Sequence, residues 1–323
     1  AVATVAARYV AHARHKRRKD STIENVESEV RVHLAPFFGD RALDAIDADD
    51  VADLISALEV KGLAPKSVRN IVGTLSALFN FAKAPRRRWA TSNPCEGAEL
   101  PGVDDNTEIR FLTLDQLDRL IAHACPGMYQ ALDATLYLVA AMTGLRLGEL
   151  AALRWRDVDW TAMQIRVVRN YVRKRYGSPK SRRSSRAVPM APEVGGVLDR
   201  LFQASAYQGD DDLVFAHPLH GGAITKANVT RRVHRALADA QLPDHVFHDL
   251  RHTFGTQCAS RGVPMRKLQE WMGHKHISTT QRYAAYAPSG SESEIIEAVF
   301  DRPGRSGFQL GSNVSESQEP ERT

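Results

Sequence analysis

Four short segments of this 323-residue chain are rich in side chains of the types that can bind or attack a phosphate group. They read TGLRLGEL at 143–150, HDLRHTFG at 248–255, WMGH at 271–274 and STTQRYAAY at 278–286. A guanidinium offers a rigid fork of donors that fits phosphate oxygens, an imidazole titrates near neutral pH, and a tyrosine hydroxyl can act as a nucleophile. The combination indicates chemistry at a phosphate.

The first two segments place their polar groups at helical spacing. Arg146 and Glu149 are three residues apart, so they share a face if that turn is helical, although a surface ion pair has the same spacing. His248, Arg251 and His252 also share a helix face, which sets a phosphate donor beside two imidazoles. Each pattern alone also fits an ordinary helix surface.

The last two segments follow one another closely. Gly273 is expected to close a helix and to leave His274 on a fixed turn. Ser278 and Gln281 form a capping-box pattern at the start of the next helix, which carries Tyr283. A single tyrosine there is ordinarily a half-buried packing residue, so this segment alone does not identify a nucleophile.

Positive charge gathers in three places: residues 14–19, residues 83–88, and residues 166–186, where nine Lys or Arg occur without Asp or Glu. Such clusters on a basic chain favour a polyanionic partner such as nucleic acid. No apolar run is long enough to span a bilayer or to form a secretory signal, so we expect a soluble intracellular protein. Three distant cysteines suggest neither disulfides nor a zinc site, and the histidine pairs lack companions at metal-ligand spacing.

The chain is expected to form two domains joined by a linker. Residues 8–82 show helical apolar patterns, with one helix over 22–34 ended by Pro36, one opened by Asp47 or Asp49, and one with a long apolar stripe from Val68 to Ala82. A Pro/Gly/polar stretch follows. We place a helical domain at 1–100, a linker at 101–109, a second domain at 110–290 and a tail at 291–323.

The second domain opens with a capping box at Thr113, and a buried helix over 131–142 is closed by Gly144. Residues 163–168 and 170–176 alternate like strands, a turn is expected at 177–179, and a third strand lies near 187–190. Helical patterns resume at 226–240, 247–261, 264–272 and 278–286. The expected fold is mainly α with a small antiparallel β-sheet.

Taken together and in order, the pattern Arg…His-x-x-Arg…Gly-His…Tyr resembles that of the tyrosine recombinases, or phage integrase family, which are site-specific DNA recombinases. The three-residue step from His248 to Arg251 and the nine-residue step from His274 to Tyr283 both match that family. The resemblance covers residues 110–288, and the preceding helical domain is similar to the family's SAM-like core-binding domain. It implies a two-domain clamp around duplex DNA.

The resemblance also implies roles for individual residues. Arg146, Arg251 and His274 would hold the phosphate, and Tyr283 would attack it to give a 3′-phosphotyrosine without ATP. His248 would assist proton removal from Tyr283, and Glu149 would orient Arg146 or His248. Tyr286, one turn away, is the rival nucleophile. The site is expected to need no metal and no other cofactor.

The family's general acid is a hairpin lysine, for which Lys180 is favoured because it directly follows the expected turn. Lys174, expected inside a strand, is the rival. Neighbouring arginines should lower the pKa of Lys180, which suits an acid near neutral pH. Thirteen basic residues of the three clusters are candidate DNA contacts: Arg14, Lys16, Arg17, Arg18, Lys19, Arg86, Arg87, Arg88, Arg173, Lys174, Arg175, Arg182 and Arg183.

Four protomers on two DNA sites, with possible DNA-bending accessory proteins, are the expected assembly. A short apolar stripe at residues 295–300 is expected to be a helix that either packs on its own domain or, as the resemblance favours, contacts a neighbouring protomer. The expected location is the cytoplasm, at the nucleoid. Two alternatives stay open: a catalytically silent DNA-binding protein, and a topoisomerase-like nicking and closing enzyme.

Overall fold

A computed structural model describes residues 1–102, 109–177 and 185–287 of the chain. The chain divides into two compact units, Ala1–Glu108 and Ile109–Thr323. Lys180, Arg182, Arg183 and the stripe at 295–300 lie outside the described residues. Within the part that is described, no helix combines the length and the apolar character needed to cross a membrane.

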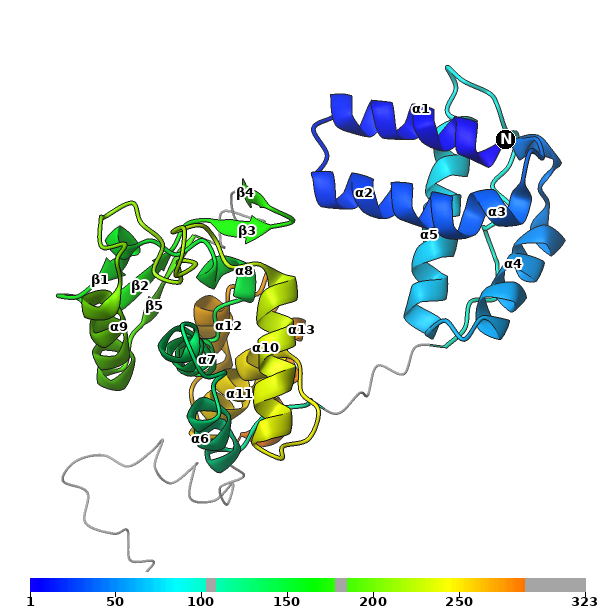
Figure 1. Ribbon diagram of the computed structural model, residues 1–323. Coiled ribbons are helices and arrows are strands. Elements are labelled where there is room, and N and C mark those ends of the chain that lie inside the picture. Colours follow the sequence, from blue (N-terminus) through cyan, green and yellow to red (C-terminus); the bar gives the residue numbers. More distant parts are fainter. Residues whose placement is uncertain (103–108, 178–184, 288–323) are drawn as a thin grey trace, which may run out of the picture. The chain divides into compact units, whose positions relative to one another are not determined.

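The first unit is helical (Figure 1). Its elements are α1 (Val2–His15), α2 (Asp20–Glu29), a π-helical turn (Val30–Leu34), α3 (Ala35–Phe38), a 3-10 turn (Leu43–Ala45), α4 (Ala48–Val60) and α5 (Pro65–Lys83). The apolar stripe of α5 from Val68 to Ala82 is fully buried, as its spacing predicts, and it packs against buried side chains of α1, α2 and α4. Asp47 caps α4 through a complete capping box, which confirms the earlier of the two expected starts.

One expected helix end in this unit is wrong. The helical path does not stop at Pro36, because the chain continues from α2 through the π-helical turn Val30–Leu34 into α3, with Pro36 in the first turn of α3. The path ends at Gly39, whose φ of 55° lies in the left-handed region that glycine adopts easily.

The helices that follow α5 belong to the second unit. They are α6 (Leu114–Ala122), α7 (Gln130–Thr143), α8 (Leu147–Leu150), α9 (Pro192–Ala204), α10 (Lys226–Asp239), α11 (Phe247–Ser260), α12 (Met265–Met272) and α13 (Ser278–Gln281), with 3-10 turns at Trp155–Asp157 and Ala284–Tyr286. Helix α7 is buried on nearly all sides and packs against α6, α9 and α11 (Figure 1). Thr113 caps α6 through a complete capping box, and Gly144 ends α7 in a left-handed conformation; both confirm the predictions.

Helix α9 was not predicted. Its inner face consists of Val194, Leu198 and Leu201, all buried, but Gly195 and Gly196 interrupt the stripe with residues that disfavour helices in isolation. Tertiary packing therefore forms this helix against its local propensity.

The strands form two separate antiparallel sheets. Strands β1 (Val158–Asp159), β2 (Gln164–Val167) and β5 (Arg186–Pro189) make one sheet in the order β1-β2-β5, with Ile165 opposite Val188 in the core. Strands β3 (Asn170–Val172) and β4 (Arg175–Gly177) pair with each other. The expected mainly helical fold with antiparallel strands is confirmed, but the strands form two small sheets where one was expected.

The β3-β4 turn corrects the expected strand over 170–176. Arg173 and Lys174 both have positive φ, 51° and 61°, as the tight primed turns of two-residue hairpins require. Lys174 therefore lies at the hairpin turn and not inside a strand, because the chain reverses four residues earlier than the Gly177-Ser178-Pro179 pattern indicated. A position at a hairpin turn therefore does not distinguish Lys180 from Lys174.

Candidate active site

Three consecutive backbone carbonyls at the end of α12 each accept a hydrogen bond from a different arginine. Trp271 O accepts from Arg186 Nε at 2.6 Å, Met272 O from Arg251 Nη2 at 2.5 Å, and Gly273 O from Arg146 Nη2 at 3.3 Å. The last carbonyls of a helix have no partner within the helix and carry partial negative charge, so they suit guanidinium donors. We call these three side chains the arginine cluster.

The cluster joins distant parts of the sequence. Arg146 precedes α8, Arg186 begins β5 and Arg251 lies in the first half of α11. Arg251 also donates through Nη1 to the carbonyl of Gly144, the residue that ends α7. Arg251 is only 2% exposed, and burial followed by the charge of Arg146 lowers its pKa to about 9, so it stays cationic at neutral pH.

Glu149 is the counter-ion of the cluster. Its carboxylate accepts from both terminal nitrogens of Arg186 at 3.1 and 3.0 Å and from Arg146 Nη1 at 2.9 Å. Burial by itself raises the pKa of Glu149, but the hydrogen bonds and charge of Arg186, and then the charge of Arg146, lower it to about 2. Glu149 thus orients Arg146 from the protein side, while the Arg146 side chain remains 39% exposed.

Two glycines make this arrangement possible. Gly273 ends α12 with φ 63°, as predicted, and a Cβ there would lie 2.9 Å from Arg186 Nη1. Gly144 has φ 64°, and a Cβ there would lie 2.5 Å from the Phe254 ring. A larger residue at either position would have a strained backbone. It would also displace the Arg186 guanidinium at position 273 or the Phe254 ring at position 144.

His274 follows Gly273 directly and is mostly buried. Its Nδ1 lies 2.9 Å from the hydroxyl of Thr280, which is itself fully buried. Burial, followed by the charges of Arg251 and Arg146, lowers the pKa of His274 to about 3, so the ring is neutral at neutral pH. When the Thr280 hydroxyl donates to Nδ1, the ring proton is on Nε2, which is then a hydrogen-bond donor.

Tyr283 is 1% exposed and belongs to a small apolar cluster with Phe254, Leu268 and Met272. Its hydroxyl lies 2.7 Å from Nδ1 of His252. The rival Tyr286 is partly exposed and packs edge-on against Phe111, with ring centroids 5.3 Å apart.

His248, expected to assist proton removal from Tyr283, lies one helical turn before His252 in α11. Its ring stands edge-on to that of His252 with centroids 5.0 Å apart, and the hydrogen bond to Tyr283 is made by His252. Burial and the charge of Arg251 lower the pKa of His248. His248 therefore lies beside the residue that contacts the tyrosine hydroxyl.

The expected capping box at Ser278 is wrong. Ile277 already has helical angles, φ −62° and ψ −32°, so Ser278 lies inside the turn and makes no cap. Helix α13 ends at Gln281, and Tyr283 directly precedes a 3-10 turn.

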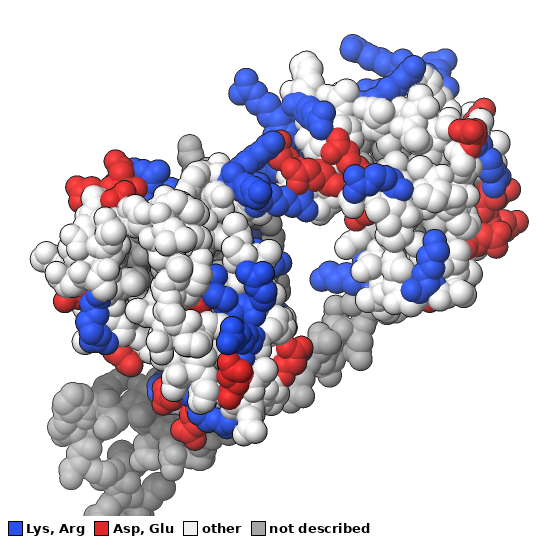
Figure 2. Space-filling view, in the orientation of Figure 1, with Lys and Arg blue, Asp and Glu red and all other residues white. Residues whose placement is uncertain are grey.

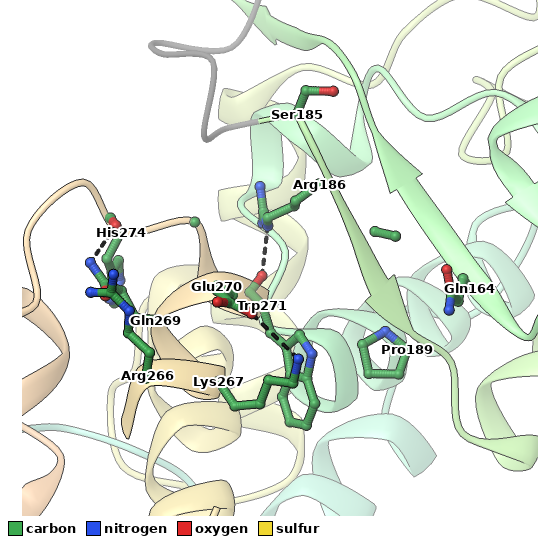
Figure 3. Close-up of a pocket in the computed structure, with 12 residues that line it drawn as sticks. Gln164, Ser185, Arg186, Pro189, Arg266, Lys267, Gln269, Glu270, Trp271 and His274 are labelled. Atoms are coloured by element: carbon green, nitrogen blue, oxygen red, sulfur yellow. Dashed lines mark hydrogen bonds and ion pairs between the residues drawn. The ribbon is translucent and has the colours of Figure 1, made fainter. Parts of the chain in front are cut away.

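A pocket of about 600 Å³ opens beside the arginine cluster, between β5 and α12 (Figure 3). Arg186 and His274 line it together with Arg266, Lys267 and Trp271. It is more basic than acidic, with Glu270 as its acidic member. In residues 1–102, 109–177 and 185–287, no group of three or more His, Cys, Asp or Glu is arranged to hold a metal ion.

The candidate DNA contacts lie mostly on exposed surface, where Lys and Arg are mixed with acidic side chains (Figure 2). Arg14 forms an ion pair with Glu27 at 2.9 Å. Arg87 differs from its neighbours, because its guanidinium lies 3.6 Å from the centroid of the Phe81 ring and donates to the Phe81 carbonyl. Arg87 is thus tied to its own unit, whereas Arg86 and Arg88 are exposed.

Comparison with known proteins places the chain in a family. Residues 110–289 match the phage integrase family, and residues 2–99 match the phage integrase central domain. The chain therefore belongs to the phage integrase family, the tyrosine recombinases, which are site-specific DNA recombinases. The resemblance inferred from the four motifs is confirmed.

Individual relatives are similar along most of the chain. A tyrosine recombinase XerC-like protein of Caldanaerobacter subterraneus is 27% identical over 315 residues, covering 88% of this chain and 78% of the relative. The ICEBs1 integrase of Bacillus subtilis is 24% identical with the same coverage.

Solved structures share the fold. The Tn1549 transposon integrase in complex with transposon right end DNA superposes with a TM-score of 0.74 at 24% identity, covering 91% of this chain and 98% of that one. A lambda integrase dimer bound to a core site superposes with a TM-score of 0.69 at 17% identity, covering 96% and 98%.

Three residues of this site were not among the predicted site residues: Arg186, His252 and Thr280. His252 carried a signal, because it shares a helix face with His248 and Arg251. Arg186 was noted only as part of the basic cluster at 166–186, and Thr280 carried no signal, because their partners Glu149, Trp271 O and His274 become neighbours only in the fold.

Proposed function

We propose that the chain cleaves and rejoins duplex DNA at specific sites through a covalent 3′-phosphotyrosine on Tyr283, without ATP. The observation that carries this proposal is the arrangement at the end of α12, where Arg146, Arg251 and His274 are held together by fixed partners. Such a preorganised set of donors suits a phosphate that gains negative charge during attack.

The site residues have different roles in this reaction. Arg146 and Arg251 neutralise the non-bridging oxygens, and His274 adds an N–H donor from its neutral ring. The Tyr283 oxygen forms a bond to phosphorus while the bond from phosphorus to the 5′ oxygen breaks, and the hydroxyl proton passes to His248, the base that the family resemblance implies. The phosphotyrosine retains the energy of the diester, so the released 5′-hydroxyl can reverse the step.

The leaving 5′ oxygen needs a proton, and we assign that role to Lys180, with Lys174 as the alternative. A substrate with sulfur in place of the bridging 5′ oxygen needs no acid, because a thiolate is a good leaving group. Lys180→Ala should cleave that substrate nearly as fast as the unaltered protein and cleave normal DNA slowly, while Lys174→Ala should cleave both normally. The reverse pattern would assign the acid to Lys174.

The decisive experiment begins by finding the site. Fragmented host genomic DNA is incubated with the protein, and the fragments that become covalently attached are recovered and sequenced. A duplex with the recovered sequence and a nick close to the cleavage point should then accumulate a protein-DNA adduct whose peptide map contains Tyr283. Failure of any DNA to become attached would favour a silent DNA-binding protein.

Two differently labelled duplexes that carry the site separate recombination from nicking and closing. A recombinase yields molecules with both labels, whereas a topoisomerase-like enzyme yields only topoisomers of each substrate. We expect exchange, carried out by four protomers on two sites in the cytoplasm at the nucleoid, with DNA-bending accessory proteins where sites are far apart. Residues 295–300 are proposed to join neighbouring protomers, so truncation after Gly290 should prevent a stable four-protomer complex while half-site binding persists.

A further inference from the structure

The side chain of Tyr283 is restrained at two points. Its ring lies against Gly255, where an added Cβ would come within 2.5 Å of Tyr283 Cζ. Its hydroxyl lies 2.7 Å from His252 Nδ1. The ring face and the hydroxyl are therefore fixed by two residues of the same helix, α11.

The local backbone contributes little to this placement. Tyr283 lies between the single turn of α13 and the 3-10 turn at Ala284–Tyr286, and neither is long enough to be stable by itself. Contacts of the side chain must therefore decide where the hydroxyl points.

The protonation states give the hydrogen bond one direction. Burial, followed by the charge of His248, lowers the pKa of His252 to about 4, so its ring is neutral at neutral pH and Nδ1 can accept. Burial raises the pKa of Tyr283, so its hydroxyl keeps its proton and donates. A cationic His252 would have no lone pair for this bond.

One face of α11 combines these contacts with the phosphate clamp. His248, Arg251, His252 and Gly255 occupy positions i, i+3, i+4 and i+7, which form a single stripe along a helix. The guanidinium that would hold the phosphate and the imidazole that holds the tyrosine hydroxyl are consecutive residues of this stripe.

We propose that His252 is a positioning residue for the nucleophile, whose Nδ1 accepts the Tyr283 hydroxyl and fixes it relative to the Arg251 clamp. This inference rests on the proposed function of Tyr283. His252 acts through its acceptor atom, so a side chain that keeps an acceptor at the position of Nδ1 replaces it, and an apolar ring does not.

The test compares His252→Asn with His252→Phe. Asparagine can place Oδ1 where Nδ1 lies but cannot take up a proton, and phenylalanine keeps a flat ring without an acceptor. The readouts are the single-turnover cleavage rate at saturating protein on the nicked duplex of the covalently recovered sequence, half-site affinity and thermal stability. His123→Asn, an exposed histidine of α6's C-terminal end, is the matched control.

We expect His252→Phe to slow cleavage by about 10- to 100-fold with unchanged affinity, because misplacing a reacting atom by about 1 Å has effects of that size. His252→Asn should stay within about threefold of the unaltered protein. Gly255→Ala, which displaces the Tyr283 ring, should slow cleavage even with His252 in place. This variant replaces His252→Phe in the test if His252→Phe does not fold.

Two outcomes would overturn the proposal. Normal cleavage by both His252 variants would mean that the hydrogen bond has no role. Equal slowing of both would mean that proton uptake by His252, and not positioning, is what cleavage requires. Tyr283→Phe distinguishes these from failure of the proposed function: if that variant still forms the adduct, Tyr283 is not the nucleophile and the function itself is wrong.

Discussion

The arginines that hold the end of α12 and the arginine at the end of α1 differ in how their side chains are held. In the second unit, Arg186 and Arg251 are buried and donate to fixed backbone carbonyls and to Glu149. In the first unit, Arg14 is 64% exposed in its side chain and pairs with a partly exposed Glu27. An exposed pair of this kind contributes at most about 1 kcal/mol to stability, because water and salt screen it.

The difference lies in what surrounds the guanidinium. A buried arginine whose partners cannot move is already oriented before a phosphate arrives, so little reorganisation remains to be done. An exposed arginine attracts phosphate over a distance but keeps its conformational freedom until contact. The arginine cluster of Arg146, Arg186 and Arg251, here the fixed set, fits chemistry at one phosphate. The exposed arginines of the candidate DNA contacts, here the exposed set, fit contact with many phosphates.

The largest expected effect comes from removing the hydroxyl oxygen of Tyr283, the proposed nucleophile beside the fixed set. Tyr283→Phe should abolish the covalent adduct while affinity for the half-site stays unchanged, because only the nucleophilic hydroxyl is lost. Tyr286→Phe is the control and should still form the adduct. The measurement is gel separation of the adduct with peptide mapping, and attachment at Tyr286 would contradict the assignment.

The next largest effect should follow from Arg251→Lys. A lysine cannot donate to Gly144 O and Met272 O at once while also facing a phosphate, since it lacks the planar fork. Loss of one preorganised donor typically lowers the rate about 100- to 1000-fold, so we expect a fall of that size in single-turnover cleavage. Exposed Arg17→Lys should change nothing, and a similar loss there would erase the contrast between the two sets.

Acidification should lower the stability of the fold through His252 and His274, which are neutral in the folded protein. The folded pKa values of His252 and His274, about 4 and about 3, lie below the ordinary value of 6.5. Between pH 6.5 and 4 the unfolded chain thus binds protons that the folded chain does not, and the free energy of unfolding falls as pH falls. After allowance for partial solvent screening, each group contributes no more than about 1 kcal/mol per pH unit.

Thermal unfolding between pH 7.5 and 4.5 measures this loss. The slope against pH should be shallower in His252→Asn, which has no ring to protonate, than in the control His123→Asn. Equal slopes would show that His252 titrates normally in the folded protein.

The smallest single effects should come from the exposed set. Each phosphate contact contributes about 0.9 to the slope of log affinity against log salt, so Arg17→Ala or Arg86→Ala should each lower that slope by about one. Cleavage at saturating protein should be unchanged. Arg87→Ala is a useful contrast, because its guanidinium packs on Phe81 and its loss should lower the thermal stability of the first unit.

The sequence by itself determined the family, the fold class and the elements whose signals are local. The stripe of α5, the capping boxes at Asp47 and Thr113 and the glycine ends of α7 and α12 depend on residues within a few positions of one another. The motif order was enough to select Arg146, His248, Arg251, His274 and Tyr283 as candidates.

Only the tertiary structure decided how those side chains are held. Helix α9, the turn at Arg173–Lys174 and the pairing of Arg186 with Glu149 depend on contacts between segments that are distant in sequence or on backbone angles that residue type does not specify. The partner of Tyr283 is the clearest case. His248 and His252 lie one helical turn apart with the same chemistry, and the path of the chain after α12 selects His252, because a hydrogen bond requires a particular distance and not merely a shared face.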